Sequence, residues 1–295
     1  MHRFQHLIFK GLSFVFRYFP FPVLYVLSDF LYFLLYTIFK YRYKIISDNL
    51  LRSFPEKTEK EILHLVKAFY RNFSDILVET FKGLGISQKA ILKRYQFINA
   101  ELLTQDFQQN QPIIILASHH TNWEWAVLSV NLWLKHQVVG IYKPLKNKKA
   151  NTFFNEHRQK WDLELVSMSK TARALVKKRD IPAAYVFIAD QTPSDIKNAH
   201  WVNFLNQETA FHHGMDKIAR RTNYPVYLAD IKRVKRGFYE VTFSLLCKEP
   251  GKTKEADITK QYAQALEKII QKDPANWLWS HRRWKRKREK KETVE

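Results

Sequence analysis

The 295-residue sequence contains a single cysteine, Cys247, and only seven glycines. One cysteine excludes an internal disulfide and any zinc or redox motif built on a Cys-x-x-Cys pair, which is consistent with a reducing, cytoplasmic setting. Cys247 falls inside an expected strand and has no histidine near it in the sequence. We therefore do not expect it to be a catalytic nucleophile.

Several motifs of enzymes are also missing from the sequence. There is no Gly-x-Ser-x-Gly segment, so direct transfer to an acceptor is favoured over a covalent enzyme intermediate. No glycine-rich phosphate loop is present, so no nucleotide cofactor is expected. The pairs His119-His120 and His212-His213 suggest a metal, but no His-Glu-x-x-His or comparable spacing accompanies them. We therefore predict neither a metal nor a cofactor.

Basic residues outnumber acidic residues in the sequence. The 49 Lys and Arg residues against 28 Asp and Glu residues give a formal net charge of +21. This charge favours a polyanionic partner, which is nucleic acid, an anionic lipid surface or an acidic protein. Seven residues near the end, 282–288, include six Lys or Arg residues. Such a run is a solvated tail by default, but near a membrane it would attract the domain to anionic lipid.

The longest apolar run lies near the N-terminus, at residues 23–39, and no cleavable signal sequence precedes it. Its length approaches the roughly 20 residues that cross a bilayer, but Ser28 and Asp29 interrupt it. We expect a single spanning helix, with a helix lying in the membrane interface and a buried helix as the alternatives. Lys40, Arg42 and Lys44 follow the run and would hold the rest of the chain on the cytoplasmic side.

Beyond this segment the pattern predicts an α/β domain. Thr58 to Glu61 reads as a capping box at the start of a long amphipathic helix, and residues 257–272 read as another helix. Helical stretches separate most of the expected strands, which favours a largely parallel sheet with an antiparallel pair around Lys235-Arg236-Gly237. The expected strands are residues 113–117, 138–142, 163–166, 183–188, 225–231 and 238–246. We divide the chain into an anchor at 1–44, an α/β domain at 45–281 with a helical lead-in at 45–95, and a basic tail at 282–295.

The strongest candidate for chemistry follows the first of these strands. His119 lies in the expected turn at the carboxyl end of the strand, and Glu124 lies in the first turn of the helix that follows. From these positions a carboxylate can hold an imidazole in one tautomer, as a general base requires. Two alternatives remain open. Thr121 and Glu124 also fit a capping box, and His120 is a rival base.

At this point the sequence resembles the late acyltransferases of lipid A biosynthesis, which belong to the glycerolipid acyltransferase superfamily. His119 and Glu124 match the His-x4-Asp/Glu motif, and five further blocks follow the order of the family. These are residues 49–55 (Asn-Leu…Phe-Pro), 142–147 (Tyr-Lys-Pro), 189–191 (Ala-Asp-Gln), 204–214 (Phe-Leu…Thr…Gly) and 273–285 (Asp-Pro…Trp…His-Arg-Arg-Trp-Lys). The resemblance covers nearly the whole chain and is closest to variants of Bacteroidetes-like bacteria.

The resemblance implies a glycerolipid-acyltransferase-like fold in the inner membrane, with the catalytic domain on the cytoplasmic side. It also implies transfer of a fatty acyl chain from acyl carrier protein to a hydroxyl of a lipid A precursor. His119 would be the general base and Glu124 its partner. The residues that would contact substrate are Arg158, Asp190, Gln191, Asn147 and Thr209. His157 stands where the family usually has glycine, and Asn206 where glycine often follows Phe-Leu.

Two other functions stay open at this stage. One is an O-acyltransferase that acts on a lysophospholipid or an aminolipid, with coenzyme A or acyl carrier protein as the acyl carrier. The other is a basic protein that binds nucleic acid, which the net charge and the interleaved aromatics would suit. The apolar N-terminal run argues against the second, so we expect no nucleic-acid partner.

Overall fold

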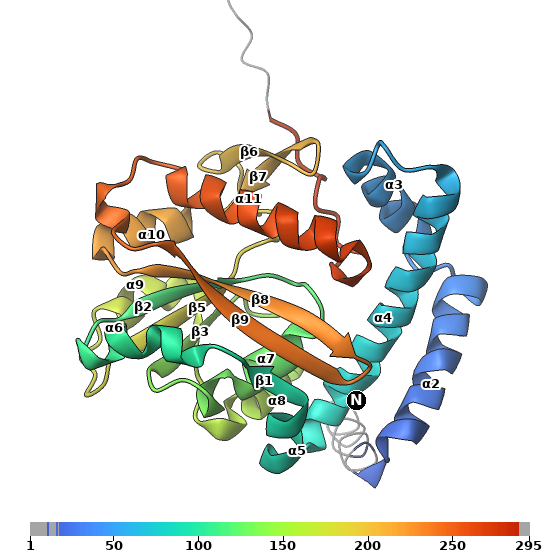
Figure 1. Ribbon diagram of the computed structural model, residues 1–295, viewed down its shortest axis with the longest axis horizontal. Helices are drawn as coiled ribbons and strands as arrows, with labels where there is room; N and C mark the ends of the chain where they lie inside the picture. The colour runs from blue at the N-terminus through green and yellow to red at the C-terminus, as the bar shows by residue number, and fades with distance from the viewer. Residues whose placement is uncertain (1–10, 12–15, 17, 289–295) are drawn as a thin grey trace, which may run out of the picture.

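The computed structural model describes Gly11, Phe16 and residues 18–288. Within these residues the chain forms an α/β fold around a seven-stranded, mostly parallel sheet, as predicted (Figure 1). Most of residues 1–17 in the expected anchor, and residues 289–295 of the expected tail, lie outside the described residues. The division into anchor, domain and tail stays a prediction.

The seven strands of the sheet follow the order β1-β9-β8-β2-β5-β3-β4. All pairs are parallel except β8 with β9, which form the antiparallel hairpin expected around Gly237. The strands are β1 (Tyr95–Phe97), β2 (Ile113–Ala117), β3 (Gln137–Tyr142), β4 (Glu164–Ser167), β5 (Ala183–Ile188), β8 (Val226–Lys235) and β9 (Phe238–Cys247). Six of them agree with the expected strands to within a few residues, and the three-residue strand β1 was not expected.

A separate antiparallel hairpin, β6 (His200–Phe204) with β7 (Gln207–Phe211), was also not expected. Its two strands mix polar and apolar residues, which hides the alternation of a half-buried strand. The connecting residues Leu205 and Asn206 both adopt left-handed backbone conformations, with φ of 51° and 61°. Two such residues are typical of a tight hairpin turn.

Helices cover both faces of the sheet (Figure 1). They are α2 (Phe21–Phe33), α3 (Tyr43–Ser53), α4 (Glu59–Gly85), α5 (Gln88–Arg94), α6 (Thr104–Gln108), α7 (Trp123–Ser129), α8 (Lys148–Arg158), α9 (Thr171–Leu175), α10 (Gly214–Thr222) and α11 (Asp257–Lys272). The Thr58–Glu61 capping box begins α4, as predicted, because each side chain bonds the backbone or side chain of the other. The expected helix at 257–272 is α11.

Strand β2 is buried on both faces, which explains its unbroken run of apolar residues. Ile114 and Leu116 join the core cluster that includes residues of α3, α4 and α11. Ile113 and Ile115 join the cluster on the opposite face, which includes residues of α5 and α7. Strand β2 is therefore held by packing on both faces, and this packing fixes the position of the residues that follow it.

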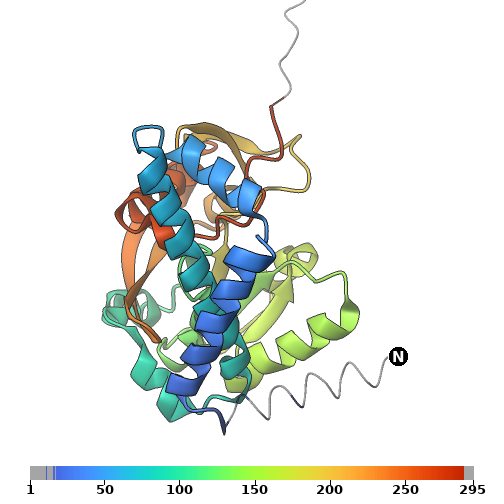
Figure 2. The ribbon, with the colours of Figure 1, turned by 90° about the vertical axis from the view of Figure 1, so that its right-hand side faces the viewer.

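Near the N-terminus, α2 continues into a π-helical turn at Leu34–Ile38. Together they form an 18-residue segment, Phe21–Ile38, that is long and apolar enough to cross a membrane, with a mean hydropathy of 1.7. Only 11% of this segment is buried. Helix α2 lies side by side with α4 in both views of the molecule (Figures 1 and 2).

The basic run near the C-terminus begins inside the fold. Arg283 is only 2% exposed, and its guanidinium donates a hydrogen bond of 2.7 Å to the carbonyl of Ala210. The indole of Trp284 donates to Thr209 and packs near Trp277. The first residues of the run are therefore part of the packed domain rather than a solvated tail.

Candidate active site

The sheet brings two segments that are far apart in the sequence to one edge. Strands β2 and β5 are parallel neighbours, and Ala117 at the end of β2 pairs with Ile188 at the end of β5. Two residues after each of these positions, the chain reaches His119 and Asp190. The carboxyl ends of parallel strands are where α/β sheets place their ligand sites.

At this edge His119 and Asp190 form a close pair. The imidazole Nδ1 lies 2.6 Å from one carboxylate oxygen of Asp190, and the backbone N–H of His119 donates to the other at 2.9 Å. The indole N–H of Trp277 donates to that second oxygen at 2.8 Å. Burial alone would raise the pKa of Asp190, but the charge and hydrogen bonds of His119, with the bond from Trp277, lower it to about 2. Asp190 is therefore a carboxylate that accepts the Nδ1 proton.

The second ring nitrogen of His119 faces away from Asp190. Since Nδ1 donates to the carboxylate, Nε2 of the neutral ring carries the lone pair. The amide nitrogen of Gln191 lies 3.1 Å from Nε2. The side chain of His119 is 16% exposed, whereas that of Asp190 is 2% exposed. The geometry is that of a base whose basic nitrogen is reachable and whose orienting carboxylate is hidden.

His120, the rival base, is held differently. Its Nδ1 lies 3.2 Å from the carbonyl of Ile231, its Nε2 lies 3.0 Å from the carbonyl of Asp273, and the residue is 2% exposed. Carbonyls accept hydrogen bonds and cannot donate, so neither nitrogen presents a lone pair to a substrate. His120 is a structural residue that ties the turn after β2 to the segment before Trp277.

Glu124 does not hold His119, contrary to our expectation. Its carboxylate forms a bidentate pair with the guanidinium of Arg158, with N–O distances of 2.7 and 2.9 Å from Nη2 and 3.2 Å from Nε. The planar fork of arginine suits a carboxylate better than an imidazole across the turn. Two predicted residues, Glu124 and Arg158, are thus brought together, but as partners of each other.

The capping alternative for Glu124 is also wrong. Helix α7 begins at Trp123, and the side chain of Asn122 accepts the hydrogen bond from the backbone N–H of Trp125. Thr121 lies before the helix with φ of 56°, a left-handed conformation. Asn122 is therefore the N-cap, and the carboxylate of Glu124 is released to bind Arg158.

The two remaining predicted residues have structural contacts. The side chain of Asn147 accepts hydrogen bonds from the backbone of Lys149 and Ala150, so it caps the N-terminus of α8. Thr209 is 1% exposed, donates to the carbonyl of Gln207 at 2.8 Å and accepts from Trp284. Neither contact joins them to the pair of His119 and Asp190.

Comparison with known proteins decides the class of the molecule. Residues 3–286 match the family described as bacterial lipid A biosynthesis acyltransferase. The chain belongs to this family. The match spans nearly the whole sequence and confirms the resemblance found in the motifs. No individual curated protein matches the chain.

This acyltransferase has an apolar cavity next to His119. The ring of Trp123 packs edge-on against the His119 ring, with centroids 5.1 Å apart, and the same indole lines the cavity. The cavity runs between α7 and the sheet, past Ala229 to Phe97 and Phe243. Every residue that lines it is apolar, so its lining matches a hydrocarbon chain in polarity.

Two residues of the site were missed by sequence reasoning, although both stand in the closing block of the family resemblance. Trp277 completes the hydrogen bonds of Asp190. His281 accepts a hydrogen bond at Nε2 from the backbone of Thr192, and burial together with the charge of Arg283 lowers the pKa of His281 to about 4. His281 is therefore neutral at neutral pH. The one feature of the sequence that pointed to a role for Trp277 and His281 in the site was their position in the block at residues 273–285, which resembles the family.

Among the described residues, no group of three or more His, Cys, Asp or Glu side chains is placed to hold a metal ion. His212 illustrates why a pair of adjacent histidines in the sequence is poor evidence for a metal site. Burial, together with the positive charges of Arg283 and Lys143, lowers the pKa of His212 to about 4. The surroundings of His212 are rich in cations, which oppose metal binding.

Proposed function

We propose that this acyltransferase moves a fatty acyl chain from a thioester donor, acyl carrier protein, to a hydroxyl of a lipid A precursor at the cytoplasmic side of the inner membrane. His119 acts as the general base and Asp190 orients it. The observation that carries the proposal is the pair of His119 and Asp190, with the His119 ring packed against Trp123, a residue that lines an apolar cavity.

In the proposed reaction the acceptor hydroxyl takes the place of Gln191 at Nε2 of His119. Nε2 removes the hydroxyl proton while the oxygen attacks the thioester carbonyl carbon, and the carbonyl oxygen becomes an oxyanion. When the intermediate collapses, the carbon–sulfur bond breaks and His119 returns the proton to the leaving thiolate. Asp190 remains ionised throughout and stabilises the transient imidazolium.

The ion pair of Glu124 and Arg158 supports the oxyanion in this proposal. The carboxylate holds Nε and Nη2 of Arg158 and leaves Nη1 with no hydrogen bond to any residue in the described part of the chain. A guanidinium fixed in one position can stabilise developing negative charge without reorganisation. Glu124 is then a positioning residue for Arg158 instead of a partner of the base.

The apolar cavity beside Trp123 would receive the acyl chain. With the chain between α7 and the sheet, the thioester lies at the end of β2, where His119 is partly exposed. An apolar wall also excludes water, which would otherwise compete with the acceptor hydroxyl. Acyl carrier protein is acidic, and the net charge of +21 would attract it.

Purified protein, acyl carrier protein loaded with a fatty acid, and a lipid A precursor would test the proposal. We expect transfer by the wild type and a decrease in kcat of roughly 10²- to 10⁴-fold for His119→Ala. His64→Ala is the matched control because His64 is an exposed histidine of α4. Normal kcat in folded His119→Ala protein would exclude His119 as the base. Transfer only to a lysophospholipid or an aminolipid would replace the proposed acceptor.

A further inference from the structure

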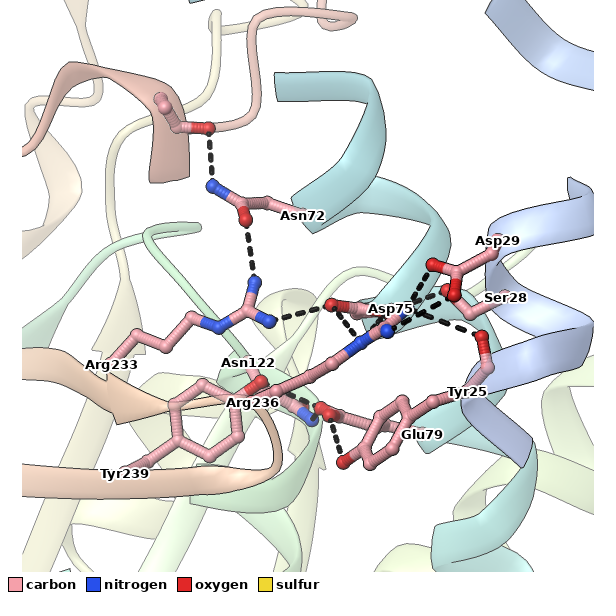
Figure 3. Close-up of polar contacts among 11 residues, drawn as sticks. Tyr25, Ser28, Asp29, Asn72, Asp75, Glu79, Asn122, Arg233, Arg236 and Tyr239 are labelled. Carbon is pink, nitrogen blue, oxygen red and sulfur yellow. Dashed lines mark hydrogen bonds and ion pairs between the residues drawn. The ribbon is translucent and has the colours of Figure 1, made fainter. Parts of the chain in front are cut away.

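Helix α2 is fastened to the domain at its middle by polar side chains (Figure 3). The hydroxyl of Tyr25 donates to Glu79 at 2.9 Å, and the hydroxyl of Ser28 donates to Asp75 at 2.6 Å. Glu79 and Asp75 both belong to α4 and are buried. Ser28, one of the two residues that interrupt the apolar run, is therefore a residue that attaches α2 to α4.

The turn of the β8–β9 hairpin reaches the same point of α2 from another direction. Arg236 joins Asp29 of α2 to Asp75 of α4, with N–O distances of 2.6 and 2.7 Å (Figure 3). Gly237 has φ of +75°, and a Cβ atom there would clash with the hydroxyl of Tyr25. The turn thus lies directly against the Tyr25 side chain of α2, and its left-handed backbone favours glycine.

The opposite face of α2 is apolar and exposed. Leu24 and Ser28, which face α4, are fully buried. The exposed residues of α2 recur at the spacing of one helical stripe, and we call them the outer stripe: Val23, Val26, Leu27, Phe30 and Phe33. Ile38 and Phe39 extend it, with 55% and 69% of their surfaces exposed.

A membrane-spanning α2 is incompatible with these contacts. Arg233 of β8 also pairs with Asp75. If α2 crossed the bilayer, its midpoint would lie in the hydrocarbon core together with Asp75, Arg233 and Arg236. Charged side chains at that depth are costly, and the open edge of a hairpin is not found exposed to lipid. The contacts and the outer stripe fit a helix that lies along the membrane surface, with its stripe in the lipid and its polar face on the domain.

We infer that α2 lies in the plane of the membrane and inserts its outer stripe into one leaflet of an anionic lipid bilayer, without crossing it. The residues that follow the stripe favour such a surface, because Lys40 and Lys44 are exposed cations that would meet the headgroups. The inference goes beyond the proposed reaction, since it concerns how the domain meets its lipid phase.

The two ends of α2 provide the decisive test. In a Cys247→Ser background, single cysteines replace Tyr18, before α2, and Lys44, after it. A maleimide that cannot cross the inner membrane is added to spheroplasts and to inverted vesicles. We expect both cysteines to react only in inverted vesicles, because both ends of α2 face the cytoplasm. Reaction of the two cysteines from opposite sides would show a spanning helix and overturn the inference.

The outer stripe itself is tested by a matched pair of variants. Val26 is 70% exposed on α2, and Val176, directly after α9, is 83% exposed. Helix α9 lies on the opposite side of the molecule from α2 (Figure 1). With vesicles of phosphatidylethanolamine and phosphatidylglycerol, Val26→Asp is expected to lower the partition coefficient by about tenfold or more, whereas Val176→Asp leaves it unchanged.

Equal partitioning of the two variants would contradict the inference. The stripe could instead cover a second copy of the chain. In that case Val26→Asp would reduce the mass of the detergent-solubilised particle and leave vesicle binding unchanged, which would also overturn the inference. Circular dichroism of both variants shows whether the fold is retained, so that a loss of binding reports on the stripe alone.

Discussion

At the scale of single residues, the proposed role of His119 as a base depends on which of its two ring nitrogens carries the proton. Asp190 accepts from Nδ1 and so keeps the lone pair on Nε2, where an acceptor hydroxyl can reach it. The bonds from the His119 backbone and from Trp277 fix the carboxylate in turn. In the proposed reaction the chemistry therefore depends on a buried carboxylate that acts through His119.

Asp190→Asn tests this dependence. An asparagine amide can donate to Nδ1 and would then stabilise the tautomer with the proton on Nε2, which cannot act as a base. We expect kcat to fall by roughly 10²- to 10⁴-fold with a small change in KM. Asp162→Asn, at an exposed position, is the control for removal of one charge. If Asp190→Asn mainly raised KM, Asp190 would be a binding residue instead.

Glu124 and Arg158 are expected to act as one unit. Glu124→Gln and Arg158→Gln should each lower kcat by about 10²-fold, because either change leaves the guanidinium absent or misplaced. The double variant should be little worse than either single variant, since interacting residues are not additive. A double-mutant cycle in kcat measures this coupling. Additive losses would mean that the two side chains act separately and that Glu124 has another role.

At the scale of elements, adjacent strands explain how the site is assembled. The sequence identified β2 and β5 from their apolar runs, and His119 from its place after β2. It also placed Asp190 after β5, but not next to His119, because strand order is decided by packing across the sheet. Equal offsets from Ala117 and Ile188 would have predicted the pair if the two strands had been known to be neighbours.

Strand β1 and the start of α7 could not be predicted from the sequence, for reasons that concern only a few residues each. Strand β1 has three residues, too few to show a period, and it is held by pairing with β9. Glu124 was expected to orient His119 because of its spacing, whereas its actual partner, Arg158, lies 34 residues further along the chain. The alternative, a capping box with Thr121, fails because Asn122 takes the cap. The competition between two neighbouring caps depends on backbone geometry, and the left-handed Thr121 could not be read from the residue types.

The contact between α2 and the β8–β9 turn predicts a stability effect. Gly237→Ala adds a methyl group where Tyr25 already lies and imposes a left-handed φ on alanine. We expect a loss of roughly 1–3 kcal/mol in the free energy of unfolding. Gly214→Ala is the control because no atom lies within 4 Å of the position of its added Cβ. Equal stability of the two variants in denaturant titrations would show that α2 is not tightly held.

At the scale of the whole molecule, two buried carboxylates give opposite pH dependences. The pKa of Asp190 falls from 3.8 to about 2, so its contribution to stability is present above pH 3.8 and is lost as the pH falls towards 2. Burial raises the pKa of Glu79 from 4.5 to about 6, against hydrogen bonds from Tyr239, Asn122 and Tyr25. The contribution of Glu79 is present below pH 4.5 and is lost as the pH rises through 6.

Unfolding free energy measured against pH in detergent checks both signs. We expect Asp190→Asn to remove a loss of about 2 kcal/mol on acidification between pH 4 and pH 2. Glu79→Gln should remove the decrease between pH 4.5 and pH 6. A variant whose curve keeps the slope of the wild type in its own window would show that the carboxylate does not titrate as described.

The whole molecule combines an exposed apolar helix, a net charge of +21, and the pair of His119 and Asp190 near an apolar cavity. The family match places the molecule in lipid A biosynthesis. The central claim is that His119 and Asp190 catalyse the transfer of one acyl chain to that lipid.

Mass spectrometry of lipid A from the host cell tests this claim most directly. Three strains are compared: the parent, a deletion, and a chromosomal His119→Ala variant whose protein level matches that of the parent. We predict that the deletion and the His119→Ala strain both accumulate lipid A that lacks one acyl chain, and that the parental gene restores it. An unchanged number of acyl chains in both strains would contradict the account.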